Sequence, residues 1–262
     1  AVAEAAMITG VAKKPLIDIE AYREDLSRFV FRSGFLMKPL FAKAKADPKR
    51  VVYAEGEDER VLRAAQVALE EGLAVPILIG RPSVVEARIA RFGLTIRPGV
   101  DFEVVNPEDD PRYRDYVQTY LEIAGRRGIT PEAARSLVRT NNTVIAALAV
   151  VRGEADAMIT GLEGRFLSRL RHIRDIIGLE PGVSDIAAMT LIITSKGAFF
   201  LTDTHVKHDP TAEEIADMTV LAAGHVERFG IEPKIALLSH SDFGAADTPS
   251  SMKMRKALGL IR

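Results

Sequence analysis

Three polar loops carry the residue types that bind anions or perform acid–base chemistry. Each follows an apolar run and precedes a helical pattern: AEGEDER at 54–60, ITGLEGR at 159–165 and LLSHSDFGA at 237–245. In open parallel sheets, ligands bind beyond the carboxyl ends of the strands, and the N-termini of the following helices attract phosphate or carboxylate groups. The three segments are therefore candidate ligand-binding loops, although ordinary strand-to-helix turns have the same composition.

The first loop also has a purely structural interpretation. Four of the five residues 55–59 are acidic, and acidic residues in the first turn of a helix stabilise it by ~0.3–1 kcal/mol through the helix dipole. Glu57 or Asp58 would then only cap the helix that follows. The sequence allows both interpretations, a ligand-binding carboxylate and a solvated helix end.

Two further clusters contain ligand-type residues in an unsuitable context. His205 and His208 have the spacing of two ligands on a helix, but they lie between a predicted strand and a helix start at Pro210, so we predict no metal site. Ser239 to Asp242 include Ser, His and Asp, yet a catalytic triad converges from separate elements, and G-x-S-x-G is absent. No strand is followed by G-x-G-x-x-G, and G-x-x-x-x-G-K-[ST] does not occur, so the chain shows no nucleotide fingerprint.

The composition is that of a globular protein with a sizeable core. The 262 residues are 47% hydrophobic and 27% charged, and 35 Lys and Arg against 36 Asp and Glu give a net charge of −1. This balance argues against partners such as nucleic acid or an anionic membrane. Cys is absent, which excludes disulfides and thiolate metal sites. We find no signal peptide and no membrane-spanning run, so we expect a cytoplasmic protein.

Strand and helix patterns alternate between residues 48 and 178, which predicts a first α/β lobe with a mainly parallel sheet and flanking helices. Apolar runs indicate strands at 50–56, 75–81, 101–107 and 155–161. Helical patterns lie between them, with two or three helices in 112–152, and another follows at 165–177. Residues 1–47 are expected to be the tail of a preceding domain and a helical connector, broken near Gly34 and Pro39.

Residues 179–262 predict a second α/β lobe of different character. Two apolar runs around Ser195-Lys196-Gly197 indicate an antiparallel hairpin, and DPTAEE at 209–214 is typical of a helix start. The apolar run Ile235 to Leu238 predicts a buried strand before the third polar loop. Thr248-Pro249 then indicates the start of a basic helix.

In this order and spacing, the segments resemble the phosphotransacetylase family over nearly all of residues 48–262. The resemblance rests on AEGEDERVLRAA, PILIGRP, ADAMITG, FLTDTHVKHDPTAEEIADM and RFGIEPKIALLSHSDFGAADTPSSMKMRKA. It implies a two-lobed α/β fold of the isocitrate/isopropylmalate-dehydrogenase-like, phosphotransacetylase type. It also implies a site for coenzyme A and an acyl phosphate in the cleft between the lobes.

One branch of the family is more similar still: the transferase-like domain of large bacterial NADP-dependent malic enzymes. The connector and LLSHSDFGAADTPSSMKMRKAL carry this resemblance. It implies a homo-oligomeric, regulatory domain that binds acetyl-CoA, or CoA, as an allosteric ligand. No cofactor is expected in this chain; NADP and a divalent metal would belong to an upstream half that decarboxylates malate oxidatively to pyruvate. The alternatives are an active phosphate acetyltransferase and an assembly module without a ligand.

Departures from the transferase pattern bear on catalysis. LEGRFLSRLRHI stands where the family has a Ser/Thr-rich turn, and Ala245 replaces a small hydroxyl residue. The resemblance places the family's catalytic Ser–Arg pair and Asp beyond Arg262, so we expect an incomplete second lobe and no catalytic residue in this chain. The expected ligand-binding residues are Glu55, Gly56, Thr160, Gly161, Arg171, Ser239, His240, Ser241, Asp242, Phe243 and Gly244.

Overall fold

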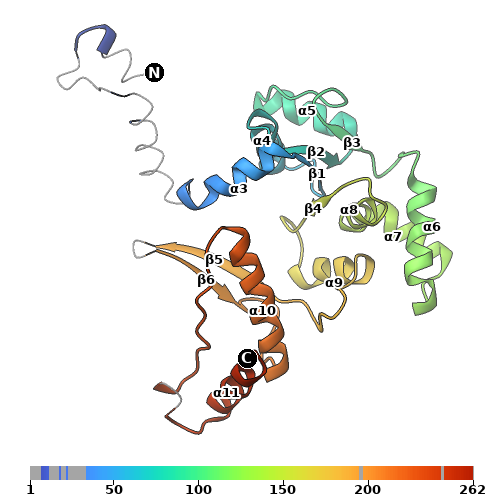
Figure 1. Cartoon of the computed structure of the whole chain (residues 1–262). Coiled ribbons are helices and arrows are strands. Elements are labelled where there is room, and N and C mark those ends of the chain that lie inside the picture. The colour runs from blue at the N-terminus through green and yellow to red at the C-terminus, as the bar shows by residue number, and fades with distance from the viewer. Residues whose placement is uncertain are drawn as a thin grey trace. The chain divides into compact units, whose positions relative to one another are not determined.

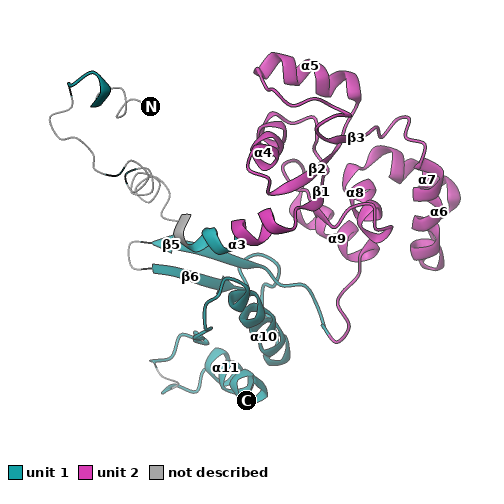
Figure 2. Cartoon of the chain, turned by 45° about the horizontal axis from the view of Figure 1, so that its top comes forward, with its two compact units in different colours: residues 1–40, 183–262 teal, residues 41–182 magenta. Residues whose placement is uncertain are grey.

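The computed structural model describes residues 7–11, 18, 22, 34–194, 197–242 and 245–261. The chain divides into two compact units, shown in Figures 1 and 2. One unit comprises residues 41–182, and the other comprises residues 183–262 together with residues 1–40. The two units divide after residue 182, four residues beyond the boundary after residue 178 that the sequence suggested.

The 41–182 unit is built from alternating strands and helices, as the sequence predicted. In chain order its elements are β1 (Lys49–Tyr53), α4 (Glu59–Glu70), β2 (Ala74–Ile79), α5 (Pro82–Phe92), β3 (Glu103–Val105), α6 (Tyr113–Ala124), the short 3-10 helix η1 (Gly125–Arg127), α7 (Pro131–Thr140), α8 (Asn142–Val151), β4 (Ala157–Ile159) and α9 (Phe166–Ile176). Helix α3 (Gly34–Ala46) precedes them. It runs through Pro39, so the break expected there is wrong. The missing proline N–H costs this helix one backbone hydrogen bond without ending it.

The four strands of this unit form one parallel sheet in the order β3-β2-β1-β4. Successive side chains of a strand point to opposite faces, which gives the sheet two cores. Val52 and Ile77 pack on one face with residues of α6, α7 and α8. Tyr53 and Leu78 pack on the other face with residues of α4 and α5. The unit is therefore a sheet between two helical layers, and the expected α/β fold is confirmed.

The other unit contains β5 (Met189–Thr194), β6 (Gly197–Thr202), α10 (Ala212–Arg228) and α11 (Pro249–Ile261). The predicted hairpin is confirmed, because β5 and β6 pair in antiparallel fashion. Helix α10 begins with a capping box, in which Thr211 Oγ1 accepts from the Glu214 N–H at 3.2 Å and Glu214 Oε2 accepts from the Thr211 N–H at 2.8 Å. None of the described helices is long and apolar enough to cross a membrane.

The strand expected at Ile235 to Leu238 is wrong. The segment has no strand conformation, and the side chains of Ile235 and Leu238 are 54% and 74% exposed. In the described part of this unit, β5 and β6 pair only with each other. An apolar run becomes a strand only where another strand supplies its backbone hydrogen bonds, and the sequence pattern does not show that partner.

Gly56, one of the expected ligand-binding residues, follows β1 at a point of close backbone approach. Its N–H donates to the Ile79 carbonyl oxygen at 3.0 Å. A Cβ atom on residue 56 would lie 2.7 Å from that oxygen and 2.8 Å from the Leu78 Cβ. Any side chain at this position would therefore push the end of β1 away from β2.

We expect Gly56→Ala to lower the free energy of unfolding by about 1–3 kcal/mol, the usual cost of overpacking. Urea unfolding of this chain, followed by circular dichroism, measures the change. Gly125→Ala is the matched control, because Gly125 has helical φ and ψ angles and no atom within 4 Å of an added Cβ. The control should be neutral or slightly stabilising. Equal losses for the two variants would contradict the packing role of Gly56.

Candidate functional site

A cavity of about 640 Å³ opens at the carboxyl edge of the parallel sheet in the 41–182 unit. The loops after β1, β2, β3 and β4 all contribute to its lining, together with residues 139–142 and the start of α9. From β1 the chain proceeds to β2 and β3 on one side, whereas β4 lies on the other side of β1. The order of the strands thus reverses between β1 and β4. At such a switch point the loops that follow the two neighbouring strands diverge and leave a crevice, and ligands of open α/β sheets bind there.

Glu55 joins the ends of β1 and β4 in this site. Its side chain is only 9% exposed, and Oε1 accepts hydrogen bonds from Thr160 Oγ1 at 3.2 Å and from the Gly161 N–H at 3.1 Å. The guanidinium of Arg169 approaches the same oxygen at 3.8 Å. Three of the sequence-predicted residues, Glu55, Thr160 and Gly161, are thus brought together from loops 105 and 106 residues apart.

A chain of hydroxyl groups links Arg169 to Glu55. Arg169 Nη1 donates to Thr143 Oγ1 at 2.5 Å, and Thr143 Oγ1 lies 2.9 Å from Thr160 Oγ1. Because Thr160 gives its proton to Glu55, Thr143 must donate to Thr160, and each hydroxyl then donates once and accepts once. Thr143 is fully buried in the first turn of α8. Sequence reasoning missed Thr143 and Arg169, because no local pattern marks a contact between α8 and α9.

Glu57 and Asp58, in the loop after β1, each contact an arginine: Arg81, which follows β2, and Arg60, which lies in the first turn of α4. Glu57 Oε1 accepts from the backbone N–H and the Nε of Arg81, both at 2.9 Å, and the Arg81 guanidinium holds the pKa of Glu57 below its usual value. Asp58 caps α4 by accepting from the Arg60 N–H at 2.8 Å, and the Arg60 side chain lowers the pKa of Asp58 to about 2. The structural interpretation of this loop therefore applies to Asp58.

The lining of the cavity is rich in both signs of charge. It includes five carboxylates and five guanidinium groups, from Glu55, Glu57, Asp58, Glu108, Glu163, Arg81, Arg88, Arg139, Arg165 and Arg169. Strongly polar cavities of this kind suit ligands with several charged or hydrogen-bonding groups. Among the residues that the structure describes, no group of three or more His, Cys, Asp or Glu side chains is arranged to hold a metal ion.

The remaining predicted residues lie elsewhere. Arg171 is exposed on α9 and does not line the cavity; Arg169, two residues earlier on that helix, does. The third loop belongs to the other unit, where Ser239 Oγ accepts from the Ser241 N–H at 3.2 Å and Ser241 Oγ accepts from the Ala246 N–H at 2.8 Å. The side chains of His240 and Asp242 are exposed. Phe243 and Gly244 lie outside the described residues.

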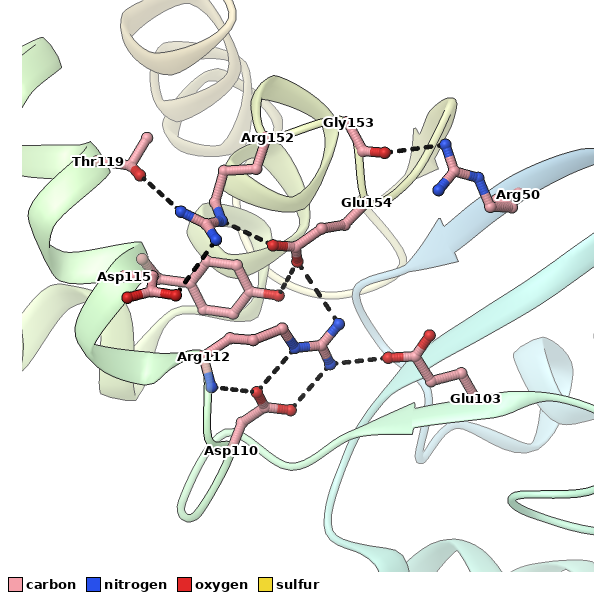
Figure 3. A network of polar contacts seen from close by, with 10 residues as sticks. Arg50, Glu103, Asp110, Arg112, Asp115, Thr119, Arg152, Gly153 and Glu154 are labelled. Carbon is pink, nitrogen blue, oxygen red and sulfur yellow. Dashed lines mark hydrogen bonds and ion pairs between the residues drawn. The ribbon is translucent and has the colours of Figure 1, made fainter.

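A second polar network supports the loop between β3 and α6, which borders the cavity (Figure 3). Glu154 accepts from Tyr116 Oη at 2.6 Å, from Arg152 Nε at 2.7 Å and from Arg112 Nη1 at 3.5 Å. Arg112 also donates to both carboxylate oxygens of Asp110. Burial, reinforced by the hydrogen bond to Glu154, raises the pKa of Tyr116. These contacts tie the start of α6 to the segment that connects α8 with β4.

Comparison with known proteins places this architecture in a family. A family model described as phosphate acetyl/butaryl transferase matches residues 35–262. The chain belongs to this family. Two solved structures of similar fold are a EutD phosphotransacetylase from Staphylococcus aureus, with a TM-score of 0.79 and 27% identity, and a phosphotransacetylase from Streptococcus pyogenes, with 0.81 and 29%. The matches cover 87% and 88% of this chain and 68% and 69% of those chains.

The curated relatives are longer proteins. The chain is 62% identical to an NAD-dependent malic enzyme of Rhizobium meliloti (strain 1021) and 50% identical to an NADP-dependent malic enzyme of Escherichia coli (strain K12). Each match covers all of this chain and 34% of the relative. A phosphate acetyltransferase of Nitratidesulfovibrio vulgaris is 33% identical over 82% of the chain and 31% of the relative. This chain therefore spans about one third of the length of these relatives.

Removing one hydroxyl tests the link between Arg169 and Glu55. We expect Thr143→Val to lower the free energy of unfolding by roughly 1–3 kcal/mol, because Val fills the same space but removes the hydrogen bond that Arg169 Nη1 donates to residue 143 and the one that Thr160 accepts from it. Urea unfolding followed by circular dichroism measures the loss. The control is Thr95→Val on the surface, which should change stability by less than about 0.5 kcal/mol.

A double-mutant cycle with Arg169→Gln completes this test. The combined loss should be smaller than the sum of the two single losses, because both changes remove the same hydrogen bond. Additive losses would contradict the hydroxyl chain.

Proposed function

We propose that this chain is the phosphotransacetylase-like regulatory and oligomerisation domain of a malic enzyme. In this proposal it binds acetyl-CoA as an allosteric inhibitor, transfers no acetyl group, and works in the cytoplasm. The observation that carries the proposal is the match of the whole chain to one third of two malic enzymes at 62% and 50% identity. The phosphate acetyltransferase relative reaches 33% over a shorter stretch.

The proposed parent enzyme decarboxylates malate oxidatively to pyruvate. Its dinucleotide and divalent metal would bind outside this chain. The relatives named as NAD-dependent and as NADP-dependent both contain this domain. We therefore propose that the rest of the parent protein determines whether NAD or NADP is used. The parent is then either an NAD-dependent or an NADP-dependent malic enzyme.

The chemistry of the cavity supports binding over catalysis. Acyl transfer needs a positioned base together with stabilisation of the developing charge. Glu57 and Asp58 have lowered pKa values because Arg81 and Arg60 engage them, so they are poor bases near neutral pH. Glu55 already accepts two hydrogen bonds at its Oε1 atom. The carboxylates around β1 are thus committed to holding the loop.

Regulation in this proposal is a shift between two arrangements of the parent enzyme. Acetyl-CoA would bind one arrangement more tightly, and that arrangement would have a less active malate site. A coupling of 1–3 kcal/mol, which is common in allosteric proteins, changes affinity about 5- to 150-fold.

We expect acetyl-CoA to inhibit malate oxidation by the full-length parent protein, and we expect no acetyl-CoA formation from acetyl phosphate and CoA above background. Reduction of the dinucleotide, followed by absorbance, measures the first activity, and a thioester assay measures the second. An authentic phosphate acetyltransferase in the same assay serves as the positive control. Clear acetyl transfer, or malate oxidation indifferent to acetyl-CoA, would contradict the proposal.

We also propose that the parent is a homo-oligomer, at least a dimer, in which a second copy covers the β5–β6 hairpin. Phe200 packs against Phe229, the residue that caps the C-terminus of α10, with ring centroids 5.1 Å apart, on one face of the hairpin. Ile192 and Phe199, paired on the opposite face, are 40% and 50% exposed. No described residue of β5 or β6 is charged, so the face can pair with itself about a two-fold axis.

Light scattering of the full-length parent at micromolar concentration should give at least the mass of a dimer. The variant Phe199→Glu should shift the mass towards the monomer, because a charge would be buried at the two-fold contact. The matched control is Thr95→Glu on the surface of the 41–182 unit, which should leave the mass unchanged. A monomer for the unaltered protein would contradict the assembly.

A further inference from the structure

A groove of about 600 Å³ follows the outer edge of β3 in the 41–182 unit, and it shares no lining residue with the cavity described above. The first two turns of α5, the start of β2 and the turn that leads into β3 border it. Strand β3 pairs with β2 on one side and, within the described part of the chain, with no strand on the other. An open sheet edge of this kind is a recurring docking place for extended peptide segments.

The edge of β3 offers one pair of backbone groups to such a segment. The Val105 carbonyl oxygen accepts from the Gly80 N–H at 3.0 Å, so the backbone groups of Val105 face β2. Successive residues of a strand direct these groups to opposite sides, and those of Val104 therefore face the open edge. The Phe102 carbonyl oxygen already accepts from the Gly99 N–H at 2.8 Å. Backbone pairing alone would thus hold an occupant weakly.

Apolar side chains of the groove supply further contacts. Val75 and Val100 are 45% and 68% exposed, whereas Phe102 is buried. Val100 lies in a turn that Asp101 stiffens, because the Asp101 carboxylate accepts from the Arg97 N–H at 2.7 Å and from the Arg97 guanidinium at 2.9 and 3.0 Å. The turn therefore presents Val100 to solvent in a fixed position, and an occupant that covers it would remove apolar surface from water.

The charged side chains that line the groove are all acidic: Glu86, Asp101 and Glu103. Asp101 and Glu103 are paired with Arg97 and Arg112, which lie outside the lining. Glu86 is exposed, and no Lys or Arg among the described residues pairs with it. An occupant that carries a lysine or arginine beside its apolar residues would therefore be favoured over an acidic one.

The size of the groove selects an occupant tethered to this chain. Ten residues line the groove, whereas stable complexes of separate proteins use about 20–30 residues on each side. A segment of the same polypeptide has an effective concentration of about millimolar, so a few contacts keep it bound. A second copy that presented the same groove would bring the acidic side chains together, which is unfavourable.

We infer that this groove docks an extended aliphatic segment, carrying a lysine or arginine, from the part of the parent polypeptide outside these 262 residues. The inference rests on the proposed function for the identity of the parent, a malic enzyme of whose relatives this chain covers 34%. It adds the surface through which the 41–182 unit contacts the rest of that protein. Val75 and Val100 would be covered by aliphatic side chains, and Glu86 would pair with the basic residue.

Photo-cross-linking in the full-length parent protein tests the contact. The variant Val100→p-benzoylphenylalanine places a light-activated group at the groove. It should cross-link to a segment outside these 262 residues, identified by mass spectrometry, in a product with the mass of one polypeptide. The matched control places the same group at Val67, which is 55% exposed on α4 and outside the groove, and it should give no such cross-link. If the change at Val100 prevents folding, the same group at Val75 should give the same cross-link.

The charge of the groove gives a second measurement. Adding Glu86→Lys should lower the yield of the cross-link from position 100 about fivefold or more, because the basic residue of the occupant would then meet a like charge. The matched control is Glu122→Lys, an exposed change on α6 outside the groove, which should leave the yield unchanged.

Cross-links confined to residues 1–262, or products with the mass of two polypeptides, would overturn the inference. A yield that Glu86→Lys does not change would also overturn it. Inhibition of malate oxidation by acetyl-CoA, measured on the unaltered parent, is an independent result. Inhibition without the cross-link would leave the proposed function standing and reject the docking, whereas the cross-link without inhibition would keep the docking and reject the regulation.

Discussion

The carboxylate of Glu55 is the interaction on which the site depends. The ladder between β1 and β4 ends with the Tyr53–Ile159 pair, and the Ala54 N–H still donates to the Ile159 carbonyl oxygen at 3.0 Å. Beyond that point Glu55 continues the connection through the Thr160 hydroxyl and the Gly161 N–H. Because β1 and β4 flank the switch point of the sheet, this one side chain sets the distance between the two loops that border the cavity.

A nearly buried carboxylate must be compensated, and the compensation shapes the rest of the site. Burying a charge without a partner costs several kcal/mol. Arg169 and the hydroxyl chain of Thr143 and Thr160 provide the compensation here. Because Arg169 and Glu55 are engaged with each other and with the hydroxyl chain, both side chains already have partners within the site. This arrangement supports the proposal that the site binds a ligand without transferring an acyl group.

Much of the fold was readable because its signals are local. The alternation of strands and helices, the hairpin, and the caps at Thr130, Asp58 and Thr211 depend on residues within one or two turns. The strand at Ile235 to Leu238 failed because pairing depends on a distant partner. In the site, Glu55, Thr160 and Gly161 were recognised from their loops, whereas Thr143 was not, since its burial depends on how α8 packs against α9. Arg171 came from family resemblance alone, and the helix places Arg169 in the cavity.

The central proposal is that acetyl-CoA binds in the cavity of the 41–182 unit. Hydrogen–deuterium exchange of the full-length parent protein, with and without saturating acetyl-CoA, tests this most directly. The account predicts slower exchange in segments 55–60, 139–144 and 163–170, which contain the loops and helix starts around the cavity. Slower exchange confined to residues 239–242 and their neighbours, with no change anywhere in 41–182, would contradict it.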